Sequence, residues 1–578
     1  MIFYKETDFK ETQIGKIPKD WELVKLSDIA EDIYYGITAK AVENETGLKM
    51  LRTTDIKNYT VDWDSLPFCE VTEKRGDIQP FLLKKGDLII ARAGTTGVSV
   101  LIEKDFENVI FGSYLIKVRL NRKVHPKFIR YFCQSRLYWD HITSSQAGST
   151  LKNISLPVLK FLNVPLPPSF EQQKIAEILS TIDEAIQKTD EIIAKTERLK
   201  KGLMQELLTK GLVLGFMFDT NIFNAILDRH IDLKQLPRNL KYYVTHIQYD
   251  EICNTQDEER RRRLLEIMEK VPSEFIVTEG AAYDVSKYGM AKYMSEADTK
   301  QYNEMLRRLK ELDEKSGKKK SPENQARDIL IALTCMKNCL TLVTNDENLK
   351  EVAQEFQCST ITFEQLLKGE HREFKNVEIG KIPKHWKVVR IGDVAQTSSG
   401  GTPNRAKREY YGGNIPWVKS SELKDNVIYD TEEKITEEGL QNSSAKIFPK
   451  GSLLIAMYGA TVGKTGILGI DAATNQAICA ILPNKTFDLH FLKNYIIFRR
   501  DRLISISSGG AQPNISQEII RAFKISLPPL QEQQKIAEIL STIDNKLDIE
   551  RNEKAKLERI KQGLMDLLLT GKIRVKVK

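Results

Sequence analysis

An apolar stripe with alternating three- and four-residue spacing occurs twice in the chain. The first copy contains Ile175, Leu179, Ile182, Ile186, Ile193, Leu199, Leu203 and Leu207. The second contains Ile536, Leu540, Ile543, Leu547, Leu557, Ile560, Leu564 and Leu568. This spacing places the apolar side chains on one narrow face of a long helix, which another helix can bury along its length. The pattern therefore predicts two long helices that pack against each other; the alternative is that each covers only its own half of the chain.

The two stripes belong to a repeat that spans most of the sequence. The dodecamer QQKIAEILSTID stands at 172–183 and returns unchanged at 533–544. Further pairs of similar segments are 9–30 with 374–395, 84–105 with 449–471, and 202–211 with 563–572. Each copy runs from a segment containing Trp (Trp21 or Trp386) through short β-type runs and Gly turns to a Pro-Pro segment and a long helix. The order predicts two related halves with an insertion between them.

Composition narrows the class of protein. The 578 residues are 29% charged and 41% hydrophobic, which is typical of soluble globular domains. Residues 211–367 hold 22 Lys and Arg against 26 Asp and Glu, so the net charge of +8 comes from the two halves. No stretch approaches the roughly 18 apolar residues of a membrane span, the first residues do not form a secretory signal, and the seven cysteines include no CxxC pair. We expect a cytoplasmic protein without membrane contact.

The repeated motifs resemble those of the specificity subunit of type I restriction–modification systems. The motifs are IGKIPK followed by Trp, the turns KKGDLIIARAGTTG and PKGSLLIAMYGATVG, and the helices that contain EQQKIAEILSTID and GLM. The resemblance implies two target-recognition domains, each reading one half of a split duplex-DNA sequence, with an antiparallel helix pair between them. It also implies methyltransferase subunits and translocating restriction subunits as partners, and no cofactor in the recognition domains.

The expected fold is mixed α/β. It combines two α+β target-recognition domains, a pair of long antiparallel coiled-coil helices, and an inserted α/β domain with a parallel sheet. The expected boundaries are 1–168 for the first recognition domain, 169–211 for the first spacer helix, 212–367 for the insert, 368–528 for the second recognition domain, and 529–578 for the second spacer helix and tail. Because the two recognition domains differ outside their common frame, we expect an asymmetric bipartite target whose spacer depends on helix length.

Base recognition requires Arg, Lys, Asn or Gln side chains that reach the major groove, and further basic residues bind phosphates. Two loops occupy corresponding places before the Pro-Pro segments, at 148–155 and 509–516. The candidate DNA contacts are Arg52, Arg92, Lys152, Asn153, Lys419, Lys464, Gln512 and Asn514. For each of these residues the alternative is an ordinary solvated side chain.

The insert carries four acidic residues in distinctive local contexts. Asp219 ends an apolar run, Glu251 follows Asp250 in YDEICN, Asp328 lies on a helix that Ser321 and Pro322 begin, and Asp346 follows the β-type run CLTLV. Acidic residues at the ends of parallel strands face the crevice where α/β domains bind ligands. Converging carboxylates would bind Mg²⁺ or Mn²⁺, which could support phosphodiester hydrolysis by metal-activated water.

This part of the sequence resembles a PIN domain, a metal-dependent ribonuclease fold. The segments that carry the resemblance are FDTNIF, YDEI, ARDILIALTC and LVTNDENL. It implies that Asp219, Glu251, Asp328 and Asp346 are metal ligands and catalytic residues, with Asn221 and Thr344 beside them and Asp250 as the alternative to Glu251. Three interpretations remain open: a toxin-like ribonuclease localised by the DNA-binding halves, a non-catalytic docking module, and an α/β domain with scattered surface carboxylates. RNA is a partner only under a nuclease interpretation.

Overall fold

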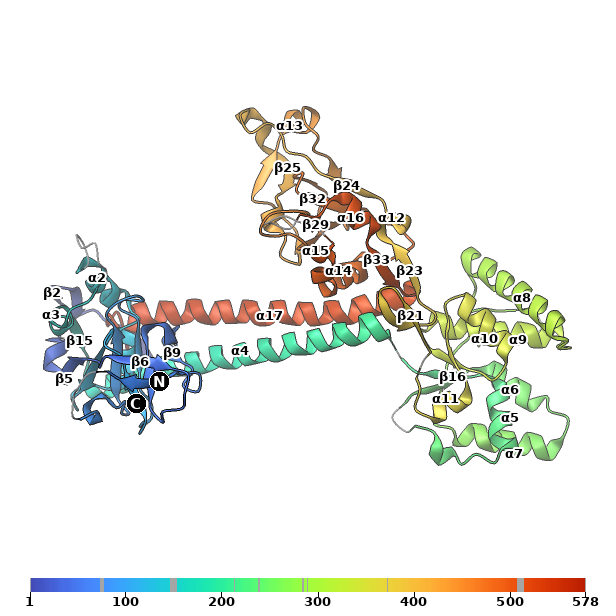
Figure 1. Ribbon diagram of the computed structural model, residues 1–578, viewed down its shortest axis with the longest axis horizontal. Helices are drawn as coiled ribbons and strands as arrows, with labels where there is room; N and C mark the ends of the chain where they lie inside the picture. The colour runs from blue at the N-terminus through green and yellow to red at the C-terminus, as the bar shows by residue number, and fades with distance from the viewer. Residues whose placement is uncertain are drawn as a thin grey trace. The chain divides into compact units, whose positions relative to one another are not determined.

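The computed structural model describes residues 2–72, 77–145, 153–212, 214–237, 240–282, 285–287, 289–371, 373–506 and 514–576. The chain forms two compact units, one of Met1–Lys195 with Leu547–Lys578 and the other of Thr196–Lys546. Each unit contains one repeated half together with parts of both long helices, which Figure 1 labels α4 and α17. The division into five domains, in which the helices stand alone, stays a prediction.

The long helices run from Ser169 to Lys210 (α4) and from Leu530 to Leu568 (α17). In the first unit, Lys561 pairs with Asp183 at 2.8 Å and Lys554 pairs with Asp190 at 2.6 Å. In the second unit, Lys200 pairs with Asp544. Within the first unit the residue numbers fall along one helix as they rise along the other, so the helices there are antiparallel. The predicted pairing of the two helices is confirmed within each unit, but the stripes are not buried along their whole length, because Leu199 and Ile560 are 57% and 52% exposed.

Each hydrophobic core takes side chains from both long helices. In the first unit, Ile175 and Leu179 of α4 share a core with Met565 and Leu568 of α17. In the second unit, Ile536 and Leu540 of α17 share a core with Met204 and Leu208 of α4. The beginning of each helix therefore covers its own half, and the end of the other helix completes the same core. Each such buried side chain contributes about 2 kcal/mol relative to an exposed one.

The unchanged dodecamer performs the same task in both halves. The side-chain oxygen of Gln172 accepts the backbone N–H of His125 at 2.8 Å, and its amide nitrogen donates to the carbonyl of Pro167 at 2.9 Å. Gln533 makes the corresponding bonds to Asp488 and Pro528, both at 2.8 Å. Because both glutamines are 1% exposed, a residue without matching donors and acceptors would leave buried backbone groups unpaired.

A buried Trp–Glu pair also recurs. The indole N–H of Trp21 donates to Glu171 at 3.1 Å, and that of Trp386 donates to Glu532 at 3.1 Å. In the first unit Arg574 provides the balancing charge, with bonds of 3.0 and 2.7 Å to the two oxygens of Glu171. Arg574 lies on β34 (Ile573–Lys576), which pairs antiparallel with β1 (Ile2–Lys5). The two ends of the chain therefore close the first unit together.

The two halves build the same sheet from corresponding strands. In the first unit the order is β12 (Ser99–Leu101), β11 (Asp87–Ala91), β14 (Leu115–Leu120) and β5 (Ala30–Tyr35). In the second unit it is β30 (Thr465–Leu468), β29 (Leu453–Ala456), β32 (Ile478–Ile481) and β24 (Thr397–Ser399). The second sheet has one further strand, β26 (Asn426–Ile428), beside β30. This common frame confirms the internal repeat at the level of strand order.

Each half adds a second sheet and short flanking elements. The second sheets contain the parallel pairs β7 (Lys49–Leu51) with β13 (Val109–Phe111) and β25 (Tyr411–Val418) with β31 (Ala472–Thr474). Two-stranded sheets join β4 (Glu22–Lys25) to β15 (Asn163–Leu166) and β23 (Lys387–Arg390) to β33 (Lys524–Leu527). The last two pairs place the strand after each Trp next to the Pro-Pro segment that begins the long helix.

The insert folds as a three-layer α/β domain with a five-stranded sheet that is parallel throughout. Its strands lie in the order β18 (Ser273–Phe275), β17 (Tyr242–Val244), β16 (Phe216–Phe218), β19 (Thr341–Val343) and β20 (Ser359–Ile361). Phe216 and Phe218 pack on one face of the sheet, and Met217 packs on the other. Burial on both faces explains the continuous apolar run of β16. Figure 1 shows α5 and α7 on one side of β16, and α8, α9 and α10 on the other.

No helix within the described ranges is both long enough and apolar enough to span a lipid bilayer.

Replacing Arg574 with Met removes the cation from Glu171, a carboxylate that is only 1% exposed. We expect the free energy of unfolding of the first unit to fall by about 3 kcal/mol, since a buried charge would lose its partner. Calorimetry of the full chain would measure this as a lower midpoint of one transition. Lys572→Met at a neighbouring exposed position is the control, and equal midpoints for both variants would contradict the assignment.

Candidate functional site

The four predicted acidic residues come from four elements of the insert. Asp219 precedes α5 (Thr220–Asp228) directly after β16, and Asp346 precedes α10 (Glu347–Glu355) shortly after β19. Because β16 and β19 are parallel neighbours, both residues lie at the same edge of the sheet. Glu251 lies on α6 (His246–Cys253) and Asp328 on α9 (Pro322–Lys337). Ser321 caps α9 as its sequence predicts, accepting the N–H of Asn324.

Asp219 is the buried centre of the group. It is 3% exposed and accepts hydrogen bonds from the hydroxyl of Thr344, at 2.7 Å, and from the side-chain amide of Asn221. The Thr344 hydroxyl also accepts the backbone N–H of Asp346 at 3.0 Å. Thr344 therefore links the two strand-end carboxylates, and both polar residues predicted beside the acidic group contact Asp219.

Burial and mutual repulsion act on three of the carboxyl groups. Burial raises the pKa of Asp219, although the Thr344 hydroxyl and the Lys320 ammonium oppose the shift. Burial, followed by the charge of Asp219, raises the pKa of Asp328 well above its usual value. Burial also raises the pKa of Glu251; the Thr220 hydroxyl opposes this and the charge of Asp219 adds to it. The carboxyl groups of Asp219, Glu251 and Asp328 are thus close enough to affect one another.

Glu251 is placed better for this group than its neighbour Asp250. Glu251 accepts a hydrogen bond from the hydroxyl of Thr220, the residue after Asp219. Asp250 instead pairs with Lys287. The structure therefore favours Glu251 of the two alternatives that the sequence leaves open.

Asp346 differs from the other three because two lysines neutralise it. Lys318 donates to its Oδ1 at 2.8 Å and Lys320 to its Oδ2 at 2.6 Å. Burial alone would raise the pKa of Asp346, but the hydrogen bonds from Lys318 and Lys320 outweigh it and lower the pKa to about 2. Its Oδ1 also accepts the backbone N–H groups of Asn348 and Leu349. Asp346 is therefore an ionised cap of α10.

The acidic group has the donor chemistry of a Mg²⁺ or Mn²⁺ site, since both ions prefer carboxylate oxygens. Among the residues that the structure describes, no three acidic, His or Cys side chains are arranged to hold a metal ion. The cation in contact with Asp328 and Asp346 is the Lys320 ammonium, at 2.5 and 2.6 Å. Carboxylate oxygens are suitable ligands for a divalent ion. In this structure, however, the oxygens of Asp328 and Asp346 are arranged around the Lys320 ammonium group.

Several predicted DNA contacts pair with acidic neighbours. Arg52 binds both oxygens of Asp55, at 3.0 and 2.7 Å. Lys419 pairs with Glu432 at 2.8 Å and Glu433 at 3.1 Å. In the structure both basic side chains are thus paired within the protein, and their role as DNA contacts stays a prediction.

Lys464 belongs to a cluster that the sequence does not reveal. Its ammonium lies 3.3 Å from Asp425, which also accepts a 2.5 Å hydrogen bond from Arg500. Arg500 additionally donates to the carbonyl of Gly463 at 2.9 Å. Arg500 lies 75 positions from Asp425 in a helical segment, so no local spacing could have identified it.

The remaining candidates gather at corresponding places in the two halves. The backbone N–H of Ile154 donates to the carbonyl of Arg92 at 2.9 Å, and that of Ile515 donates to the carbonyl of Met457 at 2.7 Å. The exposed Asn153 and Asn514 directly precede these isoleucines. The Arg92 guanidinium lies over the ring of Tyr35, 4.4 Å from its centroid. Lys152 and Gln512 lie outside the described residues.

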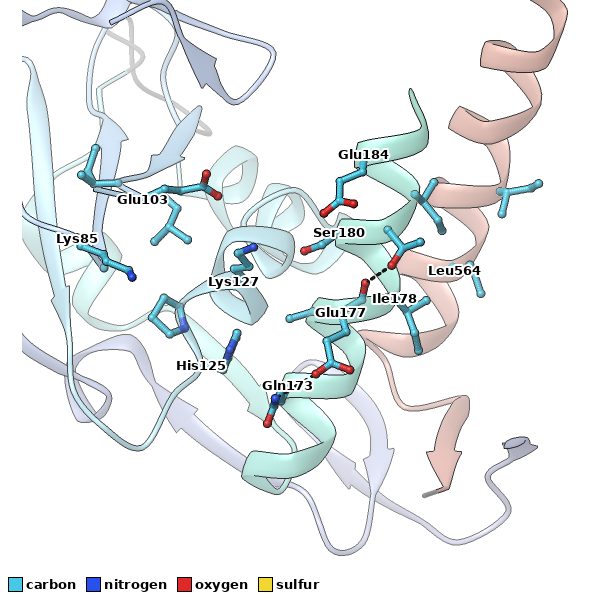
Figure 2. A pocket seen from close by; sticks show the side chains of 18 residues that line it. Lys85, Glu103, His125, Lys127, Gln173, Glu177, Ile178, Ser180, Glu184 and Leu564 are labelled. Carbon is cyan, nitrogen blue, oxygen red and sulfur yellow. Dashed lines mark hydrogen bonds between the residues drawn. The ribbon is translucent and has the colours of Figure 1, made fainter. Parts of the chain in front are cut away.

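A groove of about 1180 Å³ opens along α4 in the first unit. Figure 2 shows Gln173, Glu177, Ser180 and Glu184 on its helical side, facing Lys85, Glu103, His125 and Lys127 of the recognition half. Ile560 and Leu564 of α17 contribute apolar lining. The face of α4 that carries Gln173, Glu177, Ser180 and Glu184, which begins within the repeated dodecamer, therefore lines an open groove.

The corresponding face of α17 has a different neighbour. Gln534 and Glu538, which match Gln173 and Glu177 in the repeat, line a smaller cleft of about 500 Å³. Its other wall comes from the insert: Leu214, Tyr243, Ile276, Lys337, Asn338, Cys339 and Leu340. In the second unit the inserted domain thus borders the face that is open in the first.

Comparison with known proteins agrees with the repeated frame. A sequence profile described as "Type I restriction modification DNA specificity domain" matches residues 18–198 and 383–559, more than half of the chain. The chain belongs to this family. It is a DNA sequence-specificity subunit of the type I restriction–modification class, which confirms the resemblance of its motifs. The matched ranges leave the insert uncovered, so they do not bear on a PIN-like fold.

Two relatives from Methanocaldococcus jannaschii align with nearly all of this sequence and of their own. The MjaX specificity subunit is 24% identical over 585 residues, covering 99% of this chain and 98% of the relative. The type I restriction enzyme MjaVIII specificity subunit is 22% identical over 587 residues, covering 100% and 98%. The crystal structure of a type I S subunit from M. genitalium aligns with 96% of this chain and 97% of its own, with 14% identity and a TM-score of 0.45.

Replacing Thr344 with Val keeps the shape of the side chain but removes the hydroxyl donor of Asp219. We expect the insert to lose about 2 kcal/mol of unfolding free energy, because a buried carboxyl group loses a hydrogen bond. Thr341→Val, three residues earlier at the start of β19, removes the bond to the Ser359 hydroxyl and should cost about 1 kcal/mol. Urea unfolding of both variants measures the difference, and an equal or smaller effect of Thr344→Val would refute the proposed role.

Proposed function

We propose that each half of this specificity subunit reads one part of an asymmetric bipartite sequence in duplex DNA. The observation that carries the proposal is one sheet frame bearing different side chains at matching positions. Arg92 after β11 corresponds to Met457 after β29, and Val98 corresponds to Lys464. Side chains with different donors and charges would select different base pairs. The expected partners are methyltransferase subunits and translocating restriction subunits in the cytoplasm, with no cofactor in the recognition halves.

We further propose that the two long helices set the spacer between the half-sites. Both helices contribute side chains to the core of each recognition half, so each helix is anchored in both units. This proposal rests on the length and repeat of the helices: a rise of 1.5 Å for each residue makes a helix of about 40 residues roughly 60 Å long. The predicted spacer would change with any change in helix length.

The target sequence can be read directly from DNA methylation. In a strain that carries this gene with its methyltransferase partner, single-molecule sequencing should find methylated adenine or cytosine in one motif of two different half-sites separated by unspecified bases. Exchanging residues 84–105 for residues 449–471 should change one half-site and preserve the other. A continuous or palindromic motif would contradict the proposal that the halves read different sequences.

For the insert we propose a PIN-like, metal-dependent nuclease. Asp219, Glu251, Asp328 and Asp346 would hold Mg²⁺ or Mn²⁺, which when bound supplies an activated water for phosphodiester hydrolysis. Thr344 and Asn221 orient the Asp219 carboxylate through their hydrogen bonds. The parallel sheet, which brings Asp219 and Asp346 to one edge, supports the proposal. The arginine-rich start of α7 (Glu258–Lys270) would bind the phosphates of RNA.

Nuclease activity is tested on the purified full chain with Mn²⁺ and end-labelled single-stranded RNA and duplex DNA. We expect RNA cleavage that Asp328→Asn reduces at least a hundredfold, because a buried member of the acidic group is lost. Asp250→Asn, which removes the Lys287 partner instead, should retain activity. Cleavage of duplex DNA alone would replace RNA as the substrate. Absence of cleavage from every protein would leave the insert as a docking module.

A further inference from the structure

The segment between α8 (Glu296–Ser316) and α9 carries three consecutive lysines directly beside the acidic group. Lys318 is bonded to Asp346, whereas Lys320 bridges Asp328 and Asp346. Lys319 between them is exposed. The side chain of Lys320 is 25% exposed, less than the 40% of Lys318. Lys320 is therefore the lysine that enters the site.

A buried polar network holds this segment in place. Asp313, only 1% exposed, accepts hydrogen bonds from Gln325 at 2.8 Å and from Asn348 at 2.7 Å. Asn348 also donates to the hydroxyl of Ser316 at 2.7 Å. These bonds tie the end of α8, the first turn of α9 and the first turn of α10 together. Lys320 is thus presented to the carboxylates by a fixed loop.

The end of α8 contributes to this geometry. Gly317 terminates the helix with φ of +71°, a left-handed conformation that most other residues adopt only with strain. Four residues later, Ser321 starts α9. The short connection leaves Lys320 immediately before a helix start, where its backbone is held on both sides.

We propose that Lys320 is a built-in counter-ion that competes with a divalent cation for the acidic group. This inference rests on the proposed metal site and concerns its regulation. The Lys320 ammonium contacts one oxygen of Asp328 and one of Asp346, at 2.5 and 2.6 Å. A divalent ion bound to the same two oxygens would meet a positive charge a few Å away, and like charges at that separation repel strongly in a partly buried site. The metal binds when Lys320 withdraws.

The same contacts balance part of the negative charge of the acidic group. Asp328 is 7% exposed and lies near the charges of Asp219 and Glu251. A buried carboxylate without a balancing cation destabilises a fold, and Lys320 supplies that cation. The lysine therefore stabilises the metal-free insert and restrains metal loading through the same interaction.

The test compares the full chain with its Lys320→Met and Lys319→Met variants, which lose the same charge from adjacent positions. Isothermal titration with Mn²⁺ should give a dissociation constant at least about tenfold lower for Lys320→Met and unchanged for Lys319→Met. Lys320→Arg, which keeps the charge, should bind more weakly than Lys320→Met. Calorimetry without metal should show a lower unfolding midpoint for Lys320→Met that Mn²⁺ raises more than it raises the wild-type midpoint.

The outcomes separate this inference from the proposed nuclease. Equal Mn²⁺ affinity of wild type and Lys320→Met would overturn the competing role of Lys320 and leave the metal site standing. An equal gain in Lys319→Met would also overturn it, because the effect would then reflect net charge alone. Failure of all four proteins to bind Mn²⁺, or to be stabilised by it, would overturn both the metal site and the competition.

Discussion

The fold depends on the exchange of helix ends between the two halves. Neither long helix completes the core of its own half: Leu568 of α17 is buried with Ile175 of α4, and Leu208 of α4 is buried with Ile536 of α17. A change at the end of one helix therefore affects the recognition half that directly precedes the other helix. Ile175 and Leu568 in the first core are 393 positions apart, and Leu208 and Ile536 in the second are 328 positions apart, so each core needs residues from both long helices.

The sequence was informative wherever a contact repeats or follows a short period. The stripes predicted both long helices, the duplicate segments predicted the common frame, and Ser321 with Pro322 predicted the start of α9. The run before Asp346 predicted a buried strand and placed the carboxyl group at its end. Each of these features depends on neighbours within a few positions or on comparison of one half with the other, so each can be read along the chain.

Contacts without a local signature could not be predicted. Arg574 reaches Glu171 across about 400 residues, and Arg500 reaches Asp425 from another element. The lysine-rich segment before α9 has the composition of a solvated loop, and only its anchoring through Asp313 shows that Lys320 points inward. For the acidic group, the sequence predicted four carboxylates as a metal site, which stays a prediction, and the structure shows that Lys320 pairs with two of them. The choice between Glu251 and Asp250 likewise required the positions of Thr220 and Lys287.

The two copies of the repeated dodecamer are identical in sequence but differ in their surroundings. Gln173 and Glu177 open onto a wide groove, whereas their counterparts Gln534 and Glu538 share a cleft with the inserted domain. A protein that recognised this helical face would find it accessible beside the first recognition half and shielded beside the second. The repeat is therefore symmetric in sequence but not in accessible surface. The inserted domain borders the helical face in the second unit, whereas the corresponding face in the first unit is open.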